Sequence, residues 1–239
     1  MIGRTAWRQV RDEPSMREDR QLLEVRGLTV TYQGGVKAVQ GVDLTVDAGA
    51  IVALVGRNGA GKTSTLRGIA GFLRGEHVRV GGEILFRGRP DLSGLAAKGR
   101  DAAVVFVPEQ DKVFPRLTVE EHCELAQLSD RQISAMFGLF PKLVGLKRTK
   151  CGVMSGGERQ MLAIGVALAR EPALLLVDEF SLGLARALAL ELGSVLRRIA
   201  TERQVGVLLV EQSTVLADRL ADRSYVLEHG VVTRVVSTG

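Results

Sequence analysis

The chain of 239 residues has little cysteine, few aromatic residues and no long hydrophobic run. Its two cysteines, Cys123 and Cys151, lie far apart and match no zinc-site spacing, and its three histidines stand singly. These absences argue against a disulfide scaffold or a zinc site and favour an intracellular protein. No apolar run approaches the roughly 20 residues needed to span a bilayer, and no signal-peptide stretch is present. We therefore expect a cytoplasmic protein, for which any membrane role must come through partners.

Charge of one sign is not concentrated either. The net charge is +5, and the basic residues are scattered along the chain. A nucleic-acid-binding protein gathers its Lys and Arg residues in a patch, so we expect no nucleic-acid partner. Residues 1–21 mix both signs without apolar periodicity, which indicates a disordered tail. With a hydrophobic content of 46%, residues 22–239 are long enough to bury a sizeable core as one domain.

Two kinds of strand pattern follow the tail. Residues 22–32 and 39–49 alternate apolar and polar positions, as antiparallel strands with one solvated face do. Continuous apolar runs instead indicate parallel strands covered on both faces, and they span 50–55, 102–107, 173–177 and 205–210. Helical patterns cover 61–72, 156–170 and 185–203, with two shorter ones inside 109–153. The sequence predicts an α/β domain with a mainly parallel core sheet, an N-terminal antiparallel β subdomain and an inserted helical subdomain at about 109–153.

The segment GRNGAGKTS follows the first of these apolar runs and opens a helix. It fits the pattern G-x-x-x-x-G-K-[ST], whose glycines let backbone N–H groups curl around phosphate oxygens. Lys62 is expected to reach the β- and γ-phosphates, and the Thr63 hydroxyl to hold Mg²⁺. The nucleotide-binding residues expected in this phosphate loop are Gly56, Asn58, Gly59, Ala60, Gly61, Lys62, Thr63 and Ser64.

Two carboxylates, Asp178 and Glu179, end the apolar run at 173–177. This position is the carboxyl edge of the sheet, where open α/β folds bind their ligands. We expect Asp178 to organise Mg²⁺ and Glu179 to orient or deprotonate the attacking water. Together with the phosphate loop, these residues fit kinases, GTPases and many motor ATPases equally well.

The helix predicted from residue 156 begins with two glycines. Ser155 and Glu158 form a capping box, which explains both of these residues but not Gly156 and Gly157. Each glycine costs roughly 1 kcal/mol against alanine in a helix interior. A bare helix N-terminus with a serine hydroxyl is a phosphate-binding surface, yet the chain already has one phosphate loop. We interpret this second surface as covering the ATP bound to another subunit.

The segment MSGGERQMLAIGVALAR, closely followed by LLLVDE, resembles the signature of ABC ATPases, whose usual form is LSGGQ. The resemblance covers essentially residues 22–236 and implies ATP and Mg²⁺ as cofactors. It implies that the residues from Ser155 to Glu158 contact nucleotide across a dimer. Tyr32 matches the aromatic residue that stacks on adenine in this family, which would contribute on the order of 1 kcal/mol beyond area burial.

Finer features, over 107–122, 180–185 and 210–230, resemble the smaller ATPase subunit of branched-chain amino-acid importers. Importers of urea and short amides are close relatives. In that branch Glu109, not its neighbour Gln110, stands where most ABC ATPases carry the Gln that touches Mg²⁺ and senses the permease. Gln212 occupies the position of the switch histidine; it can hydrogen-bond the γ-phosphate or water but cannot titrate near neutral pH.

Two residues depart from the pattern of the family. Phe180 replaces the proline that typically follows the catalytic Glu, and Arg186 stands near another expected proline. Both flank the loop that passes across the dimer interface in this family. The geometry of that loop is therefore not carried over to this chain.

The resemblance implies the energy-coupling subunit of an ABC importer, peripheral on the inner face of the cell membrane. Two copies, or this chain and a paralogous ATPase, would close on two ATPs and move two membrane permease subunits. These in turn are served by an extracytoplasmic solute-binding protein. Residues 109–153 would receive the permease, with Phe114 and Leu117 as candidate contacts or, equally, as subdomain core. The ATPase never touches the solute, so the solute is not fixed by these residues.

Two other classes of protein were weighed against the importer. Non-transport ABC ATPases that act on nucleic acid or ribosomes usually carry two fused ATPase domains or long coiled-coil arms, and neither is present in this sequence. A stand-alone P-loop kinase would have no use for the segment from Ser155 to Glu158.

Overall fold

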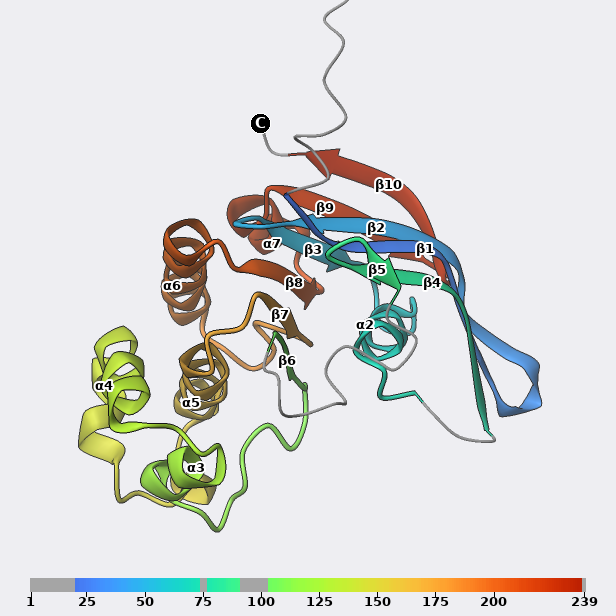
Figure 1. Cartoon of the computed structure of the whole chain (residues 1–239). Coiled ribbons are helices and arrows are strands. Elements are labelled where there is room, and N and C mark those ends of the chain that lie inside the picture. The colour runs from blue at the N-terminus through green and yellow to red at the C-terminus, as the bar shows by residue number, and fades with distance from the viewer. Residues whose placement is uncertain (1–19, 74–76, 91–102, 238–239) are drawn as a thin grey trace, which may run out of the picture.

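Two sheets and several helices build the part of the chain that the computed structural model describes, residues 20–73, 77–90 and 103–237 (Figure 1). The tail expected over 1–21 lies almost entirely outside these ranges. The smaller sheet has the strand order β2-β1-β4-β5. Its strands are β1 (Gln21–Tyr32), β2 (Val36–Asp47), β4 (Val78–Phe86) and β5 (Arg89–Pro90). β1 pairs antiparallel with both β2 and β4, which confirms the predicted N-terminal antiparallel sheet.

The larger sheet has the order β10-β9-β3-β8-β7-β6. Its strands are β3 (Ile51–Val55), β6 (Val104–Val107), β7 (Leu174–Val177), β8 (Gly206–Glu211), β9 (Arg223–Glu228) and β10 (Val231–Ser237). Every pairing from β9 to β6 is parallel, and only β10 runs antiparallel to its neighbour. The mainly parallel core sheet is thereby confirmed. The parallel strands share one carboxyl edge, and each of β3, β7 and β8 ends there next to a predicted site residue.

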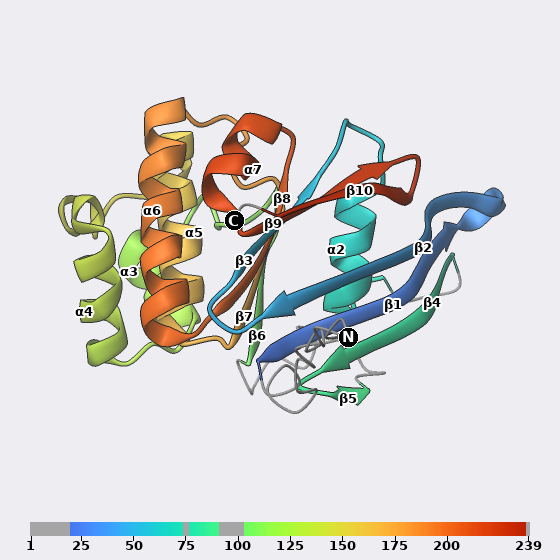
Figure 2. The same cartoon turned by 90° about the horizontal axis from the view of Figure 1, so that it is seen from above.

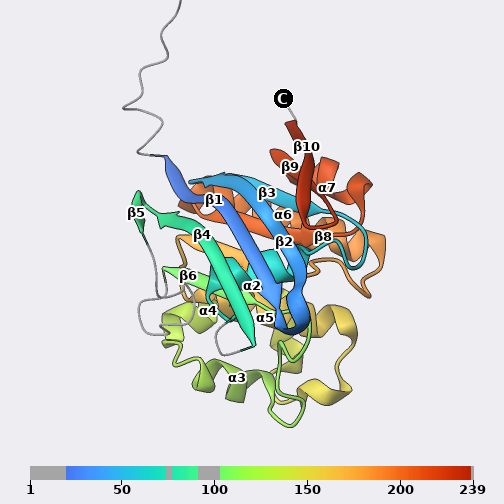
Figure 3. The ribbon, with the colours of Figure 1, turned by 90° about the vertical axis from the view of Figure 1, so that its right-hand side faces the viewer.

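Both faces of the core sheet are covered, which explains the continuous apolar runs. On β3, Ile51 and Ala53 belong to one hydrophobic core, whereas Val52 and Leu54 belong to a second one. Helices α5 (Gly156–Ala169) and α6 (Arg186–Arg203) lie over the first face, and α2 (Lys62–Ala70) lies over the other (Figure 2). The antiparallel sheet covers α2 from outside, and Figure 3 shows β4, β1 and β2 in front of that helix.

The helical insertion contains α3 (Val119–Leu125), α4 (Asp130–Leu139) and the short 3₁₀ helices η2 (Pro141–Leu146) and η3 (Cys151–Val153). Thr118 and Ser129 begin α3 and α4 with complete capping boxes. A third capping box at Ser155 begins α5, as the sequence predicts. The remaining elements are η1 (Gln33–Gly35) and α7 (Thr214–Leu220). Among the described residues, no helix combines the length and the apolar character needed to cross a membrane.

Candidate functional site

The phosphate loop connects β3 to α2, as the sequence predicts. Gly61, the residue before the helix, has a φ of 104°, and a Cβ there would lie 2.2 Å from the Ala38 carbonyl oxygen. A Cβ on Gly56 would lie 2.3 Å from the Leu227 carbonyl oxygen. Backbone cannot give way as a side chain can, so the chain itself requires glycine at both positions. The loop is therefore packed tightly against its own domain and leads directly into the first turn of α2, whose N–H groups have no intrahelical partner.

Lys62 and Thr63 point toward the two carboxylates that end β7. The Lys62 side chain is only 4% exposed; its ammonium lies 3.4 Å from Oε1 of Glu179 and donates to the Arg57 carbonyl at 3.2 Å. The Thr63 hydroxyl donates to Oδ1 of Asp178 at 3.0 Å. The structure thus brings together four residues that sequence reasoning took from two separate motifs.

The surroundings of Asp178 fit a magnesium ion. Its side chain is fully buried, and Oδ2 has no hydrogen-bond partner within the described part of the chain. Burial is the main cause that raises the pKa of Asp178, while the Thr63 hydrogen bond acts in the opposite direction. A buried, unsatisfied carboxylate oxygen is costly, and a cation would offset that cost.

The donor set at Asp178 is small. Among the described residues there is no group of three or more His, Cys, Asp or Glu side chains suited to holding a metal. One carboxylate and one hydroxyl suit Mg²⁺, which keeps several waters and takes further ligands from substrate phosphates. The prediction that Thr63 and Asp178 hold Mg²⁺ is therefore compatible with the geometry.

Glu179 is held between Lys62 and Gln212. It is buried, with a φ of 47°, in the left-handed region that residues other than glycine rarely adopt. The Gln212 side-chain amide donates to Oε2 of Glu179 at 2.9 Å. The two residues predicted as catalytic are thus in direct contact. The predicted contact of Gln212 with a γ-phosphate stays a prediction.

Glu211 is a buried carboxylate that sequence reasoning missed. It is 3% exposed and ends β8 opposite Val55. Its Oε1 accepts the backbone N–H groups of Gln212 and Ser213 at 2.8 and 3.0 Å, and Oε2 has no partner among the described residues. Asp178 was predicted because a carboxylate directly follows an apolar run. Glu211 follows the run at 205–210 in the same way, so the same pattern could have predicted it.

Tyr32 and Glu109 lie at the edges of this cluster. The Tyr32 hydroxyl and the Ser64 hydroxyl are 3.0 Å apart, which places the ring beside the first turn of α2. Glu109 follows β6 and is partly exposed, and its charge is a minor cause of the raised pKa of Asp178. Adenine stacking by Tyr32 and Mg²⁺ contact by Glu109 stay predictions, whereas the neighbouring Gln110 is exposed.

The segment that begins α5 makes its contacts away from the phosphate loop. Ser155 Oγ accepts the Glu158 N–H at 3.3 Å, and the Glu158 carboxylate accepts the Ser155 N–H at 2.9 Å. Glu158 also pairs with Lys142 at 3.3 Å. Within the described residues, no hydrogen bond or ion pair of Ser155 or Glu158 reaches the phosphate loop of the same chain.

The two glycines of α5 have different surroundings. A Cβ on Gly156 would meet nothing closer than the Gly183 carbonyl oxygen at 3.8 Å, whereas one on Gly157 would lie 2.2 Å from Leu188 Cδ2. A Cβ at Gly157 would therefore make the Leu188 side chain shift, a contact within the same chain that sequence reasoning did not foresee. Gly156 is exposed and has no such reason, so its contact with another subunit stays a prediction.

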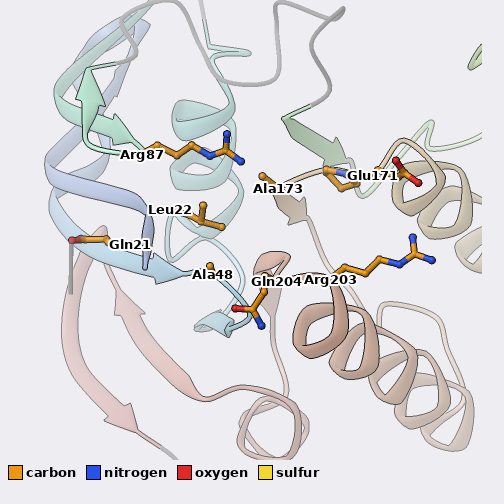
Figure 4. Close-up of a pocket in the computed structure, with 9 residues that line it drawn as sticks. Gln21, Leu22, Ala48, Arg87, Glu171, Ala173, Arg203 and Gln204 are labelled. Carbon is orange, nitrogen blue, oxygen red and sulfur yellow. The ribbon is translucent and has the colours of Figure 1, made fainter. Parts of the chain in front are cut away.

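Two cavities lie at opposite edges of the core sheet. One of about 630 Å³ is lined by the phosphate loop, Gln212 and the end of β9. The other, of about 560 Å³, lies before β7 and β8, where Figure 4 shows Arg87 extending toward Ala173. Of the predicted site residues, Gln212 and the phosphate-loop residues Gly56 and 58–60 line the first cavity, at the carboxyl edge where α/β sheets bind ligands.

Comparison with known proteins agrees with this geometry. The ABC transporter family matches residues 39–181. The chain is 40% identical over 207 residues to the high-affinity branched-chain amino acid transport ATP-binding protein BraG of Pseudomonas aeruginosa, covering 84% of this chain and 86% of that protein. It is 33% identical to the probable branched-chain amino acid transport ATP-binding protein LivF of Archaeoglobus fulgidus, covering 85% and 89%.

Importers of other solutes are also similar to the chain. The sn-glycerol-3-phosphate import ATP-binding protein UgpC of Vibrio vulnificus is 32% identical, covering 90% of this chain and 58% of that protein. Among solved structures, a dimeric bacterial ABC transporter cassette superposes with a TM-score of 0.80 at 23% identity, covering 91% of this chain and 100% of that one. At that identity the structure supports the fold alone.

Proposed function

The chain belongs to the ABC transporter family and is an ATPase, and from that premise we propose that it energises the import of branched-chain amino acids. The observation that carries the proposal is the 40% identity to BraG over 84% of this chain and 86% of that protein. The similarity to LivF supports the same solute class. UgpC is named for the import of a different solute, so the identity of the solute is part of the proposal.

The chain's own residues divide the work of ATP hydrolysis. The loop from Gly56 to Ser64 would bind the phosphates through backbone N–H groups and the Lys62 ammonium. Thr63 and Asp178 would hold Mg²⁺, which supplies charge neutralisation on the phosphates. Glu179 would accept a proton from the attacking water, and Gln212 would keep that carboxylate oriented through their 2.9 Å hydrogen bond.

The partners follow from the same proposal. A second ATPase, either another copy of this chain or a paralogue, would supply Ser155, Gly156 and Glu158 to complete the site. Permease subunits would contact the helical insertion, where the Phe114 side chain is 56% exposed although an isolated domain gains nothing by exposing it. The protein would therefore work as a peripheral subunit at the inner face of the membrane, with a solute-binding protein on the far side.

Uptake of labelled leucine, isoleucine and valine in a strain that lacks this gene tests the proposal. We expect uptake to fall, to recover with the wild-type chain, and not to recover with Glu179→Gln, because that variant keeps the fold and loses the base. Uptake of labelled urea and of glycerol 3-phosphate is measured in the same strains. Loss of uptake of either of these solutes alone would assign the chain to that importer instead.

A further inference from the structure

A buried glutamine connects two loops that the sequence keeps far apart. Gln160, on the second turn of α5, is 1% exposed. Its Oε1 accepts the Lys112 ammonium, and its Nε2 donates to the Phe180 carbonyl at 3.1 Å. A buried side-chain amide is stable only when its polar atoms find partners, so both hydrogen bonds hold Gln160 in one orientation.

Lys112 belongs to the loop between β6 and α3, residues 108–118. The Lys112 side chain is half-buried, and burial, followed by the charge of Arg159, lowers its pKa from the ordinary value. A few residues along the same loop, the Phe114 N–H donates to Nε2 of His122 at 2.7 Å while the Phe114 ring stays exposed. The loop is thus fixed to α3 near Phe114 and to α5 through Lys112.

Phe180 fixes the other end of the connection. Its side chain is fully buried, its N–H donates to the Val210 carbonyl at 3.0 Å, and its carbonyl accepts from Gln160. The residue before it, Glu179, has the left-handed φ of 47°. A non-glycine residue in that region costs about 1–3 kcal/mol and persists only where its surroundings determine it. The hydrogen bonds on both sides of Phe180 provide such surroundings.

We propose that Gln160 is a positioning residue of the ATPase, which holds the backbone of Glu179 through the Phe180 carbonyl and is itself held by Lys112. Movement of the 108–118 loop, which carries the exposed Phe114, then changes the hold on the catalytic carboxylate. This last step depends on the proposed function, because a permease is what would move the loop. The contacts from Lys112 through Gln160 to Phe180 lie within this chain and do not depend on a permease.

Amide hydrogen exchange on the full-length protein tests the connection without permease, solute or activity. In Lys112→Met and in Gln160→Met we expect exchange in the segment 178–184 to become about tenfold faster, as the loss of one hydrogen bond allows. Gln160→Glu separates the two contacts, because a carboxylate still accepts from Lys112 but cannot donate to the Phe180 carbonyl. It should loosen the segment 178–184 as Gln160→Met does.

Lys147→Met is the matched control. Lys147 is another half-buried lysine of the helical insertion, with its ammonium 4.8 Å from the centre of the Phe137 ring, and no hydrogen bond or ion pair among the described residues joins it to 108–118 or 178–184. We expect exchange in 178–184 to stay within about twofold of wild type in this variant. Equal acceleration in Lys147→Met would mean general loosening and would overturn the proposal.

Kinetics provide the second readout. Gln160→Met should lower kcat about tenfold and leave the affinity for a fluorescent ATP analogue unchanged, since the side-chain hydrogen bonds of Gln160 within the described chain go to Lys112 and Phe180 and to no predicted nucleotide-binding residue. The double variant with Lys112→Met should be no slower than Gln160→Met alone, because both residues act through one contact. Unchanged exchange in a folded Lys112→Met variant would overturn the link to the loop, even if Gln160→Met failed to fold. Neither readout measures solute import, so a failure of the chain to import branched-chain amino acids would leave the connection intact.

Discussion

Asp178 and Glu179 are consecutive residues, yet their partners give them different tasks. Asp178 faces the Thr63 hydroxyl and keeps one oxygen unsatisfied, which suits a cation ligand. Glu179 faces a lysine and a glutamine amide, which hold the carboxylate in one orientation. The backbone turn at Glu179 produces this difference, because its φ of 47° sends the two side chains to different neighbours.

The first prediction at the residue scale concerns Glu179→Gln. Removing a general base slows such reactions by roughly 10²- to 10⁴-fold, and we expect ATP hydrolysis to fall within that range. ATP affinity should remain, because the variant removes only the Glu179 carboxylate that competes with phosphate for the Lys62 ammonium. Steady-state phosphate release and nucleotide binding are measured on the same preparation. Turnover near that of the wild type would remove Glu179 from the catalytic role.

A second residue-scale prediction uses the raised pKa of Asp178, which burial causes. A carboxyl whose pKa is higher in the folded than in the unfolded chain binds its proton more readily when folded. Stability is therefore lost as pH rises from the ordinary Asp value through the raised one, and stays lower above it. Asp178→Asn removes this cost, so its melting temperature at neutral pH should exceed that of the wild type.

The same variant should lose its response to magnesium. Thermal melts with ATP alone and with ATP plus Mg²⁺ separate the two effects, because only the wild type has the carboxylate to hold the ion. Adding Mg²⁺ with ATP should raise the melting temperature of the wild type and leave that of Asp178→Asn unchanged. An Asp178→Asn variant that is less stable at neutral pH and still responds to Mg²⁺ would show that the carboxylate is structural.

At the scale of elements, the sequence predicts best where burial is continuous. The runs that became β3, β7 and β8 are continuous rather than alternating because both faces of the core sheet are covered. The strands β4, β5, β9 and β10 went unpredicted. β4 contains Gly81 and Gly82 and has one buried residue, and β10 has none, so neither shows the alternation of a half-buried strand.

The site residues also divide into those that a local sequence pattern predicts and those that only the tertiary fold brings together. The phosphate loop and the carboxylates after β7 were predictable because each is a local pattern beside a buried strand. The hydrogen bond between Gln212 and Glu179 depends on the parallel pairing of β7 and β8, which brings together residues 33 positions apart. The same applies to the packing of Gly157 against Leu188, because nothing near either residue in the sequence indicates that α5 and α6 approach so closely.

The start of α5 gives a prediction at this scale, which compares its two glycines. Gly157→Ala should be less stable than Gly156→Ala by about 1 kcal/mol, because the Leu188 side chain must shift to admit the new methyl group. Gly156→Ala should leave stability unchanged or slightly higher, since alanine favours the helix and the nearest atom to its Cβ, the Gly183 carbonyl oxygen, is 3.8 Å away. If the exposed glycine faces the phosphate of another subunit, Gly156→Ala should nevertheless lower ATPase activity. Urea unfolding and ATPase assays of both variants separate packing from function.

A compensating substitution checks the cause of the first effect. Leu188→Ala makes room beside Gly157, so the double variant Gly157→Ala with Leu188→Ala should lose less stability than the sum of the two single variants. Strict additivity would mean that the Leu188 side chain moves aside at no cost, and that Gly157 is not required for packing.

At the scale of the whole molecule, the predicted nucleotide-binding residues fall into two groups that do not hydrogen-bond to each other within the described part of the chain. The phosphate loop, Asp178 and Glu179 gather at the carboxyl edge of the sheet, while the bonds of Ser155 and Glu158 stay within α5 and the helical insertion. If two chains complete each other's sites, Lys62→Ala damages the site that a chain builds with its own phosphate loop. Ser155→Arg damages the site that the same chain completes on its neighbour, because a bulky cation blocks approach and opposes the helix dipole.

Each of these variants alone should then be nearly inactive, whereas mixing them should restore ATPase activity. One site of each mixed pair combines an intact loop with an intact α5 terminus, so random pairing of independent sites gives up to about a quarter of the wild-type rate. Ser129→Arg is the matched control, since it removes the same kind of capping box from α4 and should keep its activity. A wild type that is inactive alone would require the same test with a paralogous partner. Full activity of Ser155→Arg in a competent homodimer would contradict the composite site and leave Ser155 as a helix cap.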